Sequence, residues 1–105
     1  MGFLFFILFR MDYVYILFSE KIDRFYIGYT SNLDERLQFH KDPDPNKYTY
    51  NADDWVLFYK ISCVSKQQAL VIEKHIKRMK STTYIRNLVK YPEMAIKLLE
   101  KYKNC

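Results

Sequence analysis

The sequence predicts an α/β protein of the α+β type, built from a β-hairpin, a helix, a third strand and further helices in that order. Two short runs rich in tyrosine and β-branched residues, at 13–18 and 25–29, flank a polar gap, which is typical of a hairpin. A helical pattern follows directly, and a third apolar run lies at 55–63. Helical periodicity then continues through most of residues 66–105.

The predicted hairpin places its aromatic residues on shared faces. Strand residues alternate between faces, so Tyr13, Tyr15 and Leu17 point to one side of the sheet. A two-residue loop at 20–21 would pair Tyr15 with Tyr26 on that side. Gly28 is one of only 2 glycines, and we expect it to end the second strand at a close backbone approach or a sharp turn.

The first helix is predicted to begin near Asn32 and to end around Lys41. Asn32 and Glu35 have the spacing of a capping box, and the prolines at 43 and 45 cannot continue a helix. On a wheel of about 100° per residue, Arg36 and His40 fall within about 60° of the first leucine of the helix. We therefore expect both side chains to point toward the protein interior.

The third strand and the C-terminal helices carry most of the remaining apolar residues. The bulky run at 55–63 indicates a central, buried strand, and the polar segment 47–54 indicates a loop or a short helical turn. Ser65 caps the next helix, and Ser81 begins another segment that Tyr91-Pro92 interrupts. The apolar residues expected to pack inward are Ala69, Ile72, Ile76, Met79, Leu88, Ile96 and Leu99.

Glu73 is the only acidic residue between Asp54 and Glu93, and it lies about 40° from Ala69 at the edge of the predicted buried stripe. Two interpretations are open. The carboxylate can form a surface ion pair with Lys77 four residues later, which would contribute some tenths of a kcal/mol. It can also bind a hard divalent cation, which takes oxygen ligands and needs few protein carboxylates when phosphate supplies the rest.

The charge is distributed unevenly along the chain. Residues 1–65 carry 7 basic and 9 acidic side chains, whereas residues 66–105 carry 10 basic and 3 acidic ones, within a total of +5. A C-terminal part at +7 beside a remainder at −2 favours a polyanionic partner, because lysine and arginine that neutralise phosphates release counterions. The alternative is a basic helical face that is only solvated.

Length and cysteine usage set further limits. We expect residues 11–105 to form one domain with one modest core. Cys63, Cys105, His40 and His75 lack metal-ligand spacing, and the cysteine usage fits a reducing, cytoplasmic location. The apolar leader at 1–10 is far shorter than the roughly 20 residues of a membrane span and lacks signal-peptide features. We expect either a start at Met11 or a loosely held leader, with a short membrane-touching tail as the alternative.

Several residues together carry a resemblance to a known family. They are the Tyr-Val-Tyr of 13–15, the Tyr-Ile-Gly of 26–28, Asn32-Leu33, Arg36, His40, and Glu73 on a later helix. This combination resembles the GIY-YIG nuclease superfamily and is similar to its small stand-alone bacterial members. The resemblance covers about residues 11–90, with Tyr13 where the first motif has glycine.

The resemblance implies a three-stranded antiparallel sheet flanked by helices, with extra C-terminal helices, and a metal-dependent phosphodiesterase site. It implies that Glu73 binds one Mg²⁺ or Mn²⁺ and that Arg36 holds a nonbridging phosphate oxygen. Tyr15, with Tyr26 and His40, would orient or deprotonate the attacking water. Whether Tyr15 or His40 is the base stays open.

Two function classes follow. The first is an endonuclease that hydrolyses phosphodiester bonds in DNA with weak sequence specificity, in repair, recombination or processing of unusual structures. The second is a nucleic-acid-binding module whose catalytic power is weak or lost. We expect DNA rather than RNA as partner, no membrane and no obligate protein partner. The basic residues predicted to contact phosphates are Lys74, Lys77, Arg78, Lys80, Arg86 and Lys90.

Overall fold

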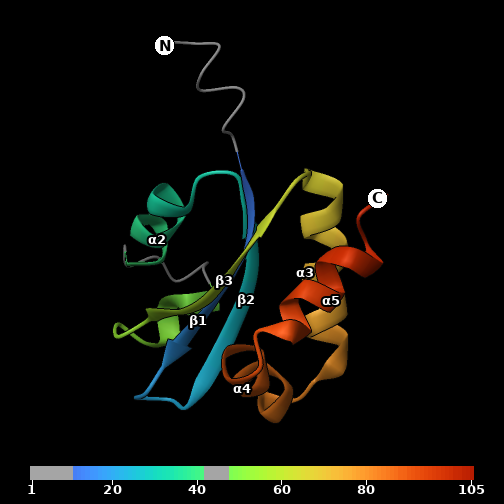
Figure 1. Ribbon diagram of the computed structural model, residues 1–105. Helices are drawn as coiled ribbons and strands as arrows, with labels where there is room; N and C mark the ends of the chain where they lie inside the picture. The colour runs from blue at the N-terminus through green and yellow to red at the C-terminus, as the bar shows by residue number, and fades with distance from the viewer. Residues whose placement is uncertain (1–10, 42–47) are drawn as a thin grey trace.

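The computed structural model describes residues 11–41 and 48–105, and its elements follow the predicted order (Figure 1). The strands are β1 (Asp12–Ser19), β2 (Arg24–Thr30) and β3 (Val56–Cys63). The helices are α2 (Leu33–Lys41), α3 (Lys66–Met79), α4 (Thr82–Lys90) and α5 (Glu93–Lys101), and the 3₁₀ turn η1 (Tyr48–Asn51) precedes β3. The strands form one antiparallel sheet in the order β2-β1-β3, so the predicted fold class is confirmed.

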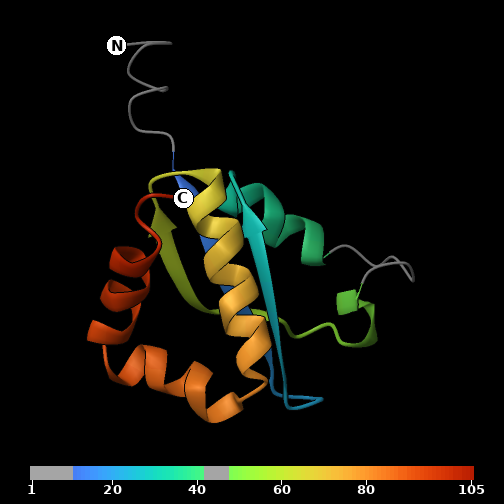
Figure 2. The same cartoon turned by 90° about the vertical axis from the view of Figure 1, so that its right-hand side faces the viewer.

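Helices cover both faces of this sheet (Figure 1 and Figure 2). α2 lies on one face, and α3, α4 and α5 lie on the other. Alternation along β1 supplies a core to each side: Val14 and Ile16 are buried with residues of α3 to α5, while Tyr15 and Leu17 are buried with Trp55 and residues of α2. The predicted assignment of β1 side chains to two faces is confirmed.

β1 is the central strand, so the predicted central position of residues 55–63 is wrong. β1 pairs with β2 along one edge and with β3 along the other. Of the eight residues of β3, four are exposed, among them Val56 at 60% and Leu57 at 39%. A run of bulky residues suits a half-buried edge strand as well as a fully buried one, and only the pairing of the strands decides between them.

The β1–β2 hairpin closes with the four residues 20–23 instead of the predicted two. Asp23 in this loop has a φ of 51°, in the left-handed region that aspartate tolerates better than most residues. Tyr15 therefore pairs with Gly28, and Tyr26 pairs with Leu17. The predicted Tyr15–Tyr26 pairing is wrong by two residues, but a shift of two leaves both tyrosines on the same face.

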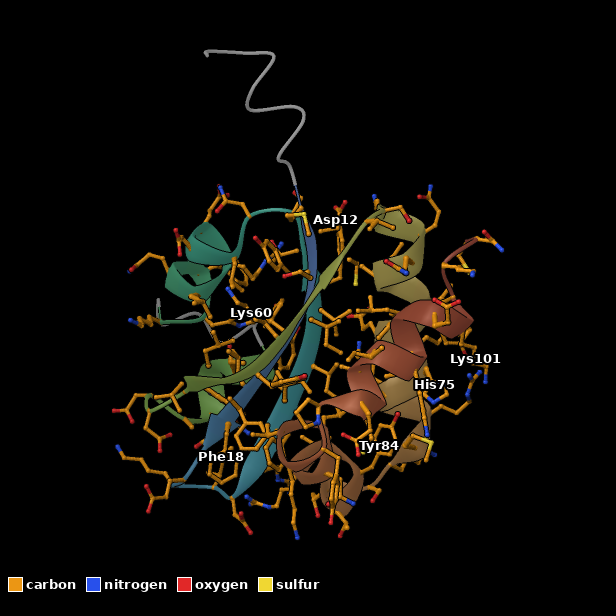
Figure 3. All side chains as sticks on the ribbon, in the orientation of Figure 1. Asp12, Phe18, Lys60, His75, Tyr84 and Lys101 are labelled. Carbon is orange, nitrogen blue, oxygen red and sulfur yellow. The ribbon has the colours of Figure 1, made fainter. Side chains whose placement is uncertain are left out.

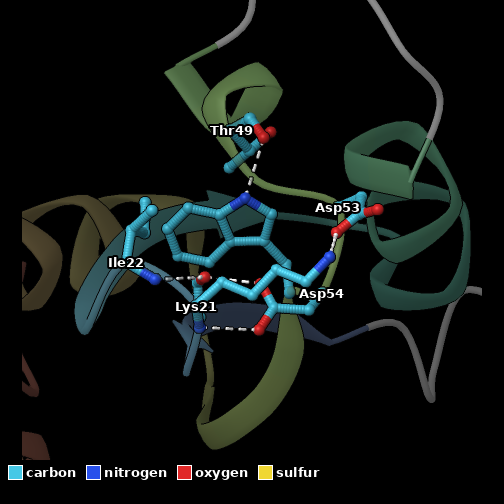
Figure 4. A network of polar contacts seen from close by, with 7 residues as sticks. Lys21, Ile22, Thr49, Asp53 and Asp54 are labelled. Carbon is cyan, nitrogen blue, oxygen red and sulfur yellow. Dashed lines mark hydrogen bonds and ion pairs between the residues drawn. The ribbon is translucent and has the colours of Figure 1, made fainter.

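The segment before β3 holds the hairpin loop in place (Figure 4). The Asp54 carboxylate accepts hydrogen bonds from the Ser19 hydroxyl and, at 2.9 Å, from the backbone N–H of Lys21. These bonds, the Ser19 bond first, lower the pKa of Asp54. Lys21 also forms an exposed ion pair with Asp53. The loop conformation is thus tied to residues more than 30 positions away in the chain.

Three helices begin at the predicted caps. Asn32 accepts the N–H of Glu35 at 3.2 Å, and its side-chain amide donates to the Glu35 carboxylate at 3.4 Å. Ser65 and Ser81 each accept the N–H of the residue three positions later at 3.0 Å. Local capping chemistry was therefore sufficient to place the starts of α2, α3 and α4.

Two residues predicted to face the core do not. Met79 is 45% exposed because it is the last residue of α3, where the chain turns at Lys80 with a φ of 48°. Ile96 is 64% exposed because α5 buries Ala95 and Leu98 on its other side. The other predicted positions are buried or pack against the core, and they are Ala69, Ile72, Ile76, Leu88 and Leu99.

An aromatic cluster fastens the three C-terminal helices to one another (Figure 3). The Nδ1 atom of His75 on α3 lies 2.9 Å from the hydroxyl of Tyr102 at the end of α5. The ring of Tyr84 on α4 lies 6.2 Å from the His75 ring, centroid to centroid. Burial, assisted by nearby Lys101 and Arg78, lowers the pKa of His75.

The predicted leader at 1–10 and the two prolines expected to stop α2 lie outside the described residues. Within the part of the chain that is described, no helix has the length and apolarity to cross a membrane. Cys63 is buried and Cys105 is exposed, and both are free thiols.

Candidate active site

Tyr15 is the most deeply buried of the predicted site residues, at 1% exposure. Its ring lies across Gly28, its partner on β2: a Cβ added to Gly28 would stand 2.5 Å from Cζ of Tyr15 and closer still to the hydroxyl oxygen. Gly28 lies inside β2 and does not end the strand as expected. Two reasons were predicted for this glycine, a sharp turn and a close approach to the backbone. The structure contains the close approach, which is made by the ring of Tyr15.

His40 joins Tyr15 to the segment before β3. It is 7% exposed, and its Nε2 atom lies 2.7 Å from the Tyr15 hydroxyl. On the opposite side of the ring, Nδ1 lies 2.9 Å from Oγ1 of Thr49 in η1. The predicted inward orientation of His40 on α2 is confirmed, and both ring nitrogens contact buried hydroxyls.

Tyr26 completes an aromatic group on the α2 side of the sheet. Its ring centroid lies 6.2 Å from that of Tyr15 and 4.9 Å from that of His40. Because Tyr26 is half-buried while Tyr15 is covered, Tyr26 extends the group toward the surface. Three of the five residues predicted to be catalytic are thus in mutual contact.

Arg36 lies one helical turn before His40 on α2 and is half-buried. Its guanidinium carbon is 4.9 Å from the ring centroid of Phe39, a cation–π distance that restrains the group. Arg36 also lines a cavity of about 260 Å³ beside the start of α2. The remaining residues that line it are Thr30, Ser31, Asn32, Glu35 and Phe39.

Glu73 lies on α3, in the helical layer opposite α2. Its side chain is 17% exposed, as the edge position on the helix predicted, and Lys77 places its ammonium 3.3 Å from one carboxylate oxygen. The predicted surface ion pair is therefore present. It does not decide between the two interpretations of Glu73, because a carboxylate paired with an ammonium at a surface can exchange it for another cation.

The charges of Arg36 and Glu73 act on the same hydroxyl. Burial raises the pKa of Tyr15 most, Tyr26 raises it further, Arg36 opposes the rise, and Glu73 adds to it. We refer to the five residues predicted to be catalytic, which come from β1, β2, α2 and α3, as the candidate region.

β2, which carries Tyr26, is an edge strand of the sheet, with α2 on one side of it and α3 on the other (Figure 2). A cavity of about 300 Å³ is lined by Phe25, Tyr26, Ile27 and Lys77. Tyr26 belongs to the core on the α2 side, whereas Phe25 and Ile27 belong to the core on the α3 side. The cavity is thus lined by residues that pack against the cores on both faces of the sheet.

The predicted metal ligand fits a site with one protein carboxylate. Among residues 11–41 and 48–105 there is no group of three or more histidine, cysteine or acidic side chains that could hold a metal ion. Mg²⁺ keeps several water ligands and is commonly bound through one or two carboxylates together with phosphate oxygens. A half-buried Glu73 meets that requirement, with Lys77, which lines the cavity at β2, as the competing cation.

The predicted phosphate-binding residues are exposed, but they differ in position. Lys77 lines the cavity at β2. The guanidinium carbon of Arg86 lies 5.4 Å from the ring of Phe18 and 5.2 Å from the ring of Phe25, which also lines that cavity. Lys90 instead lies 5.3 Å from the ring of Tyr91 and is not among the cavity residues. Lys74, Arg78 and Lys80 lie on or directly after α3.

Comparison with known proteins identifies the family. A profile of the GIY-YIG catalytic domain matches residues 11–86. The chain belongs to the GIY-YIG family. UPF0213 protein OB0043 of Oceanobacillus iheyensis is 36% identical over 70 residues, which cover 67% of this chain and 80% of that protein. No solved structure matches the chain.

Membership makes this chain part of a superfamily of nucleases that act on nucleic acid. The GIY-YIG match runs from β1 into α4 and contains all five residues predicted to be catalytic, whereas α5 lies beyond it. In this GIY-YIG chain the first motif is Tyr-Val-Tyr, and its last residue, Tyr15, contributes the buried hydroxyl.

Two residues of the region were missed from the sequence. Thr49 and Trp55 are both buried, and the indole Nε1 of Trp55 donates a hydrogen bond of 2.8 Å to the carbonyl oxygen of Thr49. Thr49 stands in a short polar segment without periodicity, and Trp55 was assigned to the third strand. No pattern in the sequence distinguishes them from ordinary loop and strand residues, because Thr49 acts through a contact with His40 nine positions away and Trp55 acts through its bond to Thr49.

Proposed function

We propose that this GIY-YIG protein is an endonuclease that uses one Mg²⁺ or Mn²⁺ ion to hydrolyse phosphodiester bonds in DNA. One observation carries the proposal: the hydroxyl of Tyr15 is hydrogen-bonded to His40, lies beside Tyr26, and is influenced by the charges of Arg36 and Glu73. A base, a cationic group and a carboxylate are the parts that phosphodiester hydrolysis requires.

Tyr15 and His40 share the work of the base in this proposal. Burial raises the pKa of Tyr15, so a free phenolate is disfavoured near neutral pH. The Nε2 atom of His40 lies 2.7 Å away, and imidazole is the side chain best suited to accept a proton in this range of pH. As the attacking water gives a proton to the Tyr15 oxygen, Tyr15 gives its own proton to Nε2 of His40. Tyr26 orients the water beside them.

Arg36 and Glu73 act on the phosphate from the two sides of β2. Arg36, restrained by Phe39, contacts a nonbridging oxygen and offsets the charge that develops on it. Glu73 would hold the divalent cation, since one protein carboxylate suffices when water and phosphate oxygens supply the remaining ligands. When bound, that cation supplies Lewis-acid stabilisation of the phosphate and of the leaving oxygen.

We propose DNA as the substrate, recognised through its backbone. The predicted phosphate-binding residues lie on or next to α3 and on α4, and Lys77 and Arg86 lie beside the cavity at β2. Contacts of this type carry little sequence information, which supports weak specificity and a role in repair, recombination or processing of unusual structures. Residues 11–105 form one domain in this proposal, and the free thiols support a cytoplasmic location.

The test is a cleavage screen over single-stranded, duplex, flapped and branched DNA and RNA, with and without Mg²⁺ or Mn²⁺. Glu73→Gln should lower the cleavage rate by about 100-fold or more while DNA binding persists, because a charge that stabilises the transition state is lost. Glu100→Gln, which removes an exposed carboxylate of α5, is the matched control. Undiminished cleavage by pure Glu73→Gln protein would remove Glu73 from the mechanism.

A second candidate function is a nucleic-acid-binding module with weak or lost catalysis. The ion pair between Glu73 and Lys77 favours it, because a carboxylate that keeps its lysine partner binds no metal. This candidate predicts salt-dependent DNA binding without metal-dependent cleavage of any substrate in the screen. Metal-dependent cleavage that Glu73→Gln abolishes would exclude it.

A further inference from the structure

Thr49 holds the ring of His40 from the side opposite Tyr15. Its side chain is 1% exposed, and its Oγ1 atom lies 2.9 Å from Nδ1 of His40, whose Nε2 atom lies 2.7 Å from the Tyr15 hydroxyl. The imidazole is thus placed between two buried hydroxyl groups contributed by β1 and η1. Rotation of the ring by half a turn, or a shift along its plane, would disturb both contacts.

The position of Thr49 is itself fixed. Its carbonyl oxygen accepts a 2.8 Å hydrogen bond from the indole of Trp55, which is 6% exposed (Figure 4). The next residue back, Asp54, is bonded to Ser19 and Lys21 of the hairpin. The segment before β3 is therefore anchored at the sheet, and Thr49 presents its hydroxyl to His40 from a restrained backbone.

The contact between Thr49 and His40 bears on which ring nitrogen of the neutral imidazole carries the hydrogen. A neutral imidazole has one N–H and one acceptor nitrogen. To take a proton from Tyr15, Nε2 must be the acceptor, so Nδ1 must carry the hydrogen and needs an acceptor of its own. Oγ1 of Thr49 is that acceptor, since a hydroxyl oxygen has lone pairs and a hydrogen that rotates away.

We propose that Thr49 is a positioning residue of the reaction, which keeps His40 in the Nδ1–H form with Nε2 directed at Tyr15. The inference rests on the proposed nuclease function. The water proton moves to Tyr15, the Tyr15 proton moves to Nε2, and the Nδ1 proton stays on His40 throughout. The imidazolium that forms donates to Thr49 through Nδ1 and to the Tyr15 oxygen through Nε2.

The first test measures the tautomer in the unaltered full chain and needs no cleavage. Long-range proton–nitrogen NMR spectra of protein labelled with ¹⁵N-histidine distinguish the two ring nitrogens of His40, and His75→Gln removes the other histidine signal for assignment. We expect hydrogen on Nδ1 and an unprotonated Nε2 at a pH where the ring is neutral. Hydrogen on Nε2 would overturn the proposal.

The second test compares Thr49→Val, which keeps the shape and removes the hydroxyl, with Thr49→Ser, which keeps the hydroxyl. Removal of the group that orients a functional histidine typically costs about 10- to 100-fold in activity. We therefore expect Thr49→Val to lower kcat by that factor with an unchanged KM for DNA, and Thr49→Ser to stay within about threefold of the original kcat. Equal kcat values for Thr49→Val and the unaltered protein would overturn the proposal.

The two tests also separate this proposal from the nuclease function. A protein that cleaves no substrate, but whose Nδ1–H signal is lost in Thr49→Val, would refute the nuclease function and leave the contact between Thr49 and His40 supported. An active nuclease in which Thr49→Val leaves tautomer and kcat unchanged would refute only the role of Thr49. Should Thr49→Val fail to fold, the tautomer of the unaltered protein decides.

Discussion

Gly28→Ala should destabilise the protein, against the usual effect of that substitution in a strand. Glycine in a strand interior typically costs about 0.5 to 1 kcal/mol relative to alanine, so backbone preference alone predicts a gain in the free energy of unfolding. In this structure the added Cβ would stand 2.5 Å from Cζ of Tyr15, where ordinary contact begins at 3.4 Å. The tyrosine ring would have to move by about 1 Å.

The magnitude follows from what surrounds that ring. Tyr15 is 1% exposed, contacts the rings of Tyr26 and His40, and is hydrogen-bonded to His40, so it has no space into which to move. Overpacking of a filled core costs about 1 to 3 kcal/mol. After subtracting the backbone gain, we expect Gly28→Ala to lower the free energy of unfolding by about 1 to 2 kcal/mol.

Urea denaturation measures this loss, and a double-mutant cycle identifies its cause. With a slope of about 2 kcal/mol per M, the midpoint should fall by about 0.5 to 1 M. In a Tyr15→Val background the added methyl group has room, so Gly28→Ala should become neutral or stabilising, with a coupling energy of about 1 to 3 kcal/mol. Additive effects of the two substitutions, or an unchanged midpoint for Gly28→Ala alone, would refute the reasoning.

Three further predictions concern charge. Burial raises the folded-state pKa of Tyr15 above the usual value of about 10. The contribution of Tyr15 to stability is therefore complete below pH 10 and is lost as the pH rises further. The Tm should consequently fall less steeply above pH 10 in Tyr15→Phe than in the unaltered protein. Lys77→Gln should tighten Mn²⁺ binding measured without DNA by about two- to fivefold, because it removes the cation paired with Glu73, while Lys74→Gln should change it little. In DNA binding, Lys74→Gln should lower the slope of log K against log salt concentration by about one, and Lys97→Gln on α5 should leave it unchanged.

The parts of the fold that depend on neighbouring residues could be predicted from the sequence. The cap at Asn32 and the inward direction of His40 follow from spacing within one helix, and the faces of β1 follow from strict alternation. The reason for a glycine at position 28 could also be predicted, because a glycine within a strand indicates that another group approaches the backbone closely. Each of these inferences needs only a few consecutive residues.

The parts of the fold that depend on residues distant in the chain could not be predicted from the sequence. The four-residue hairpin loop is held by Asp54, and the edge position of β3 depends on which strand pairs with β1. Thr49 contacts His40 from a backbone to which the indole of Trp55, six positions later, is hydrogen-bonded. Propensity and periodicity contain no information about such contacts, since several arrangements satisfy the same local pattern.

The position of the candidate site at an edge strand explains why its residues are held by two separate cores. Tyr15 and Tyr26 belong to the core shared with α2 and Trp55, whereas Glu73 is carried by α3, whose Ile72 and Ile76 pack in the core on the opposite face. Only a strand without a neighbour on one side lets residues from both faces meet around its edge. The relative placement of the carboxylate and the tyrosine hydroxyl therefore depends on the sheet, because β1 and β2 lie between α2 and α3.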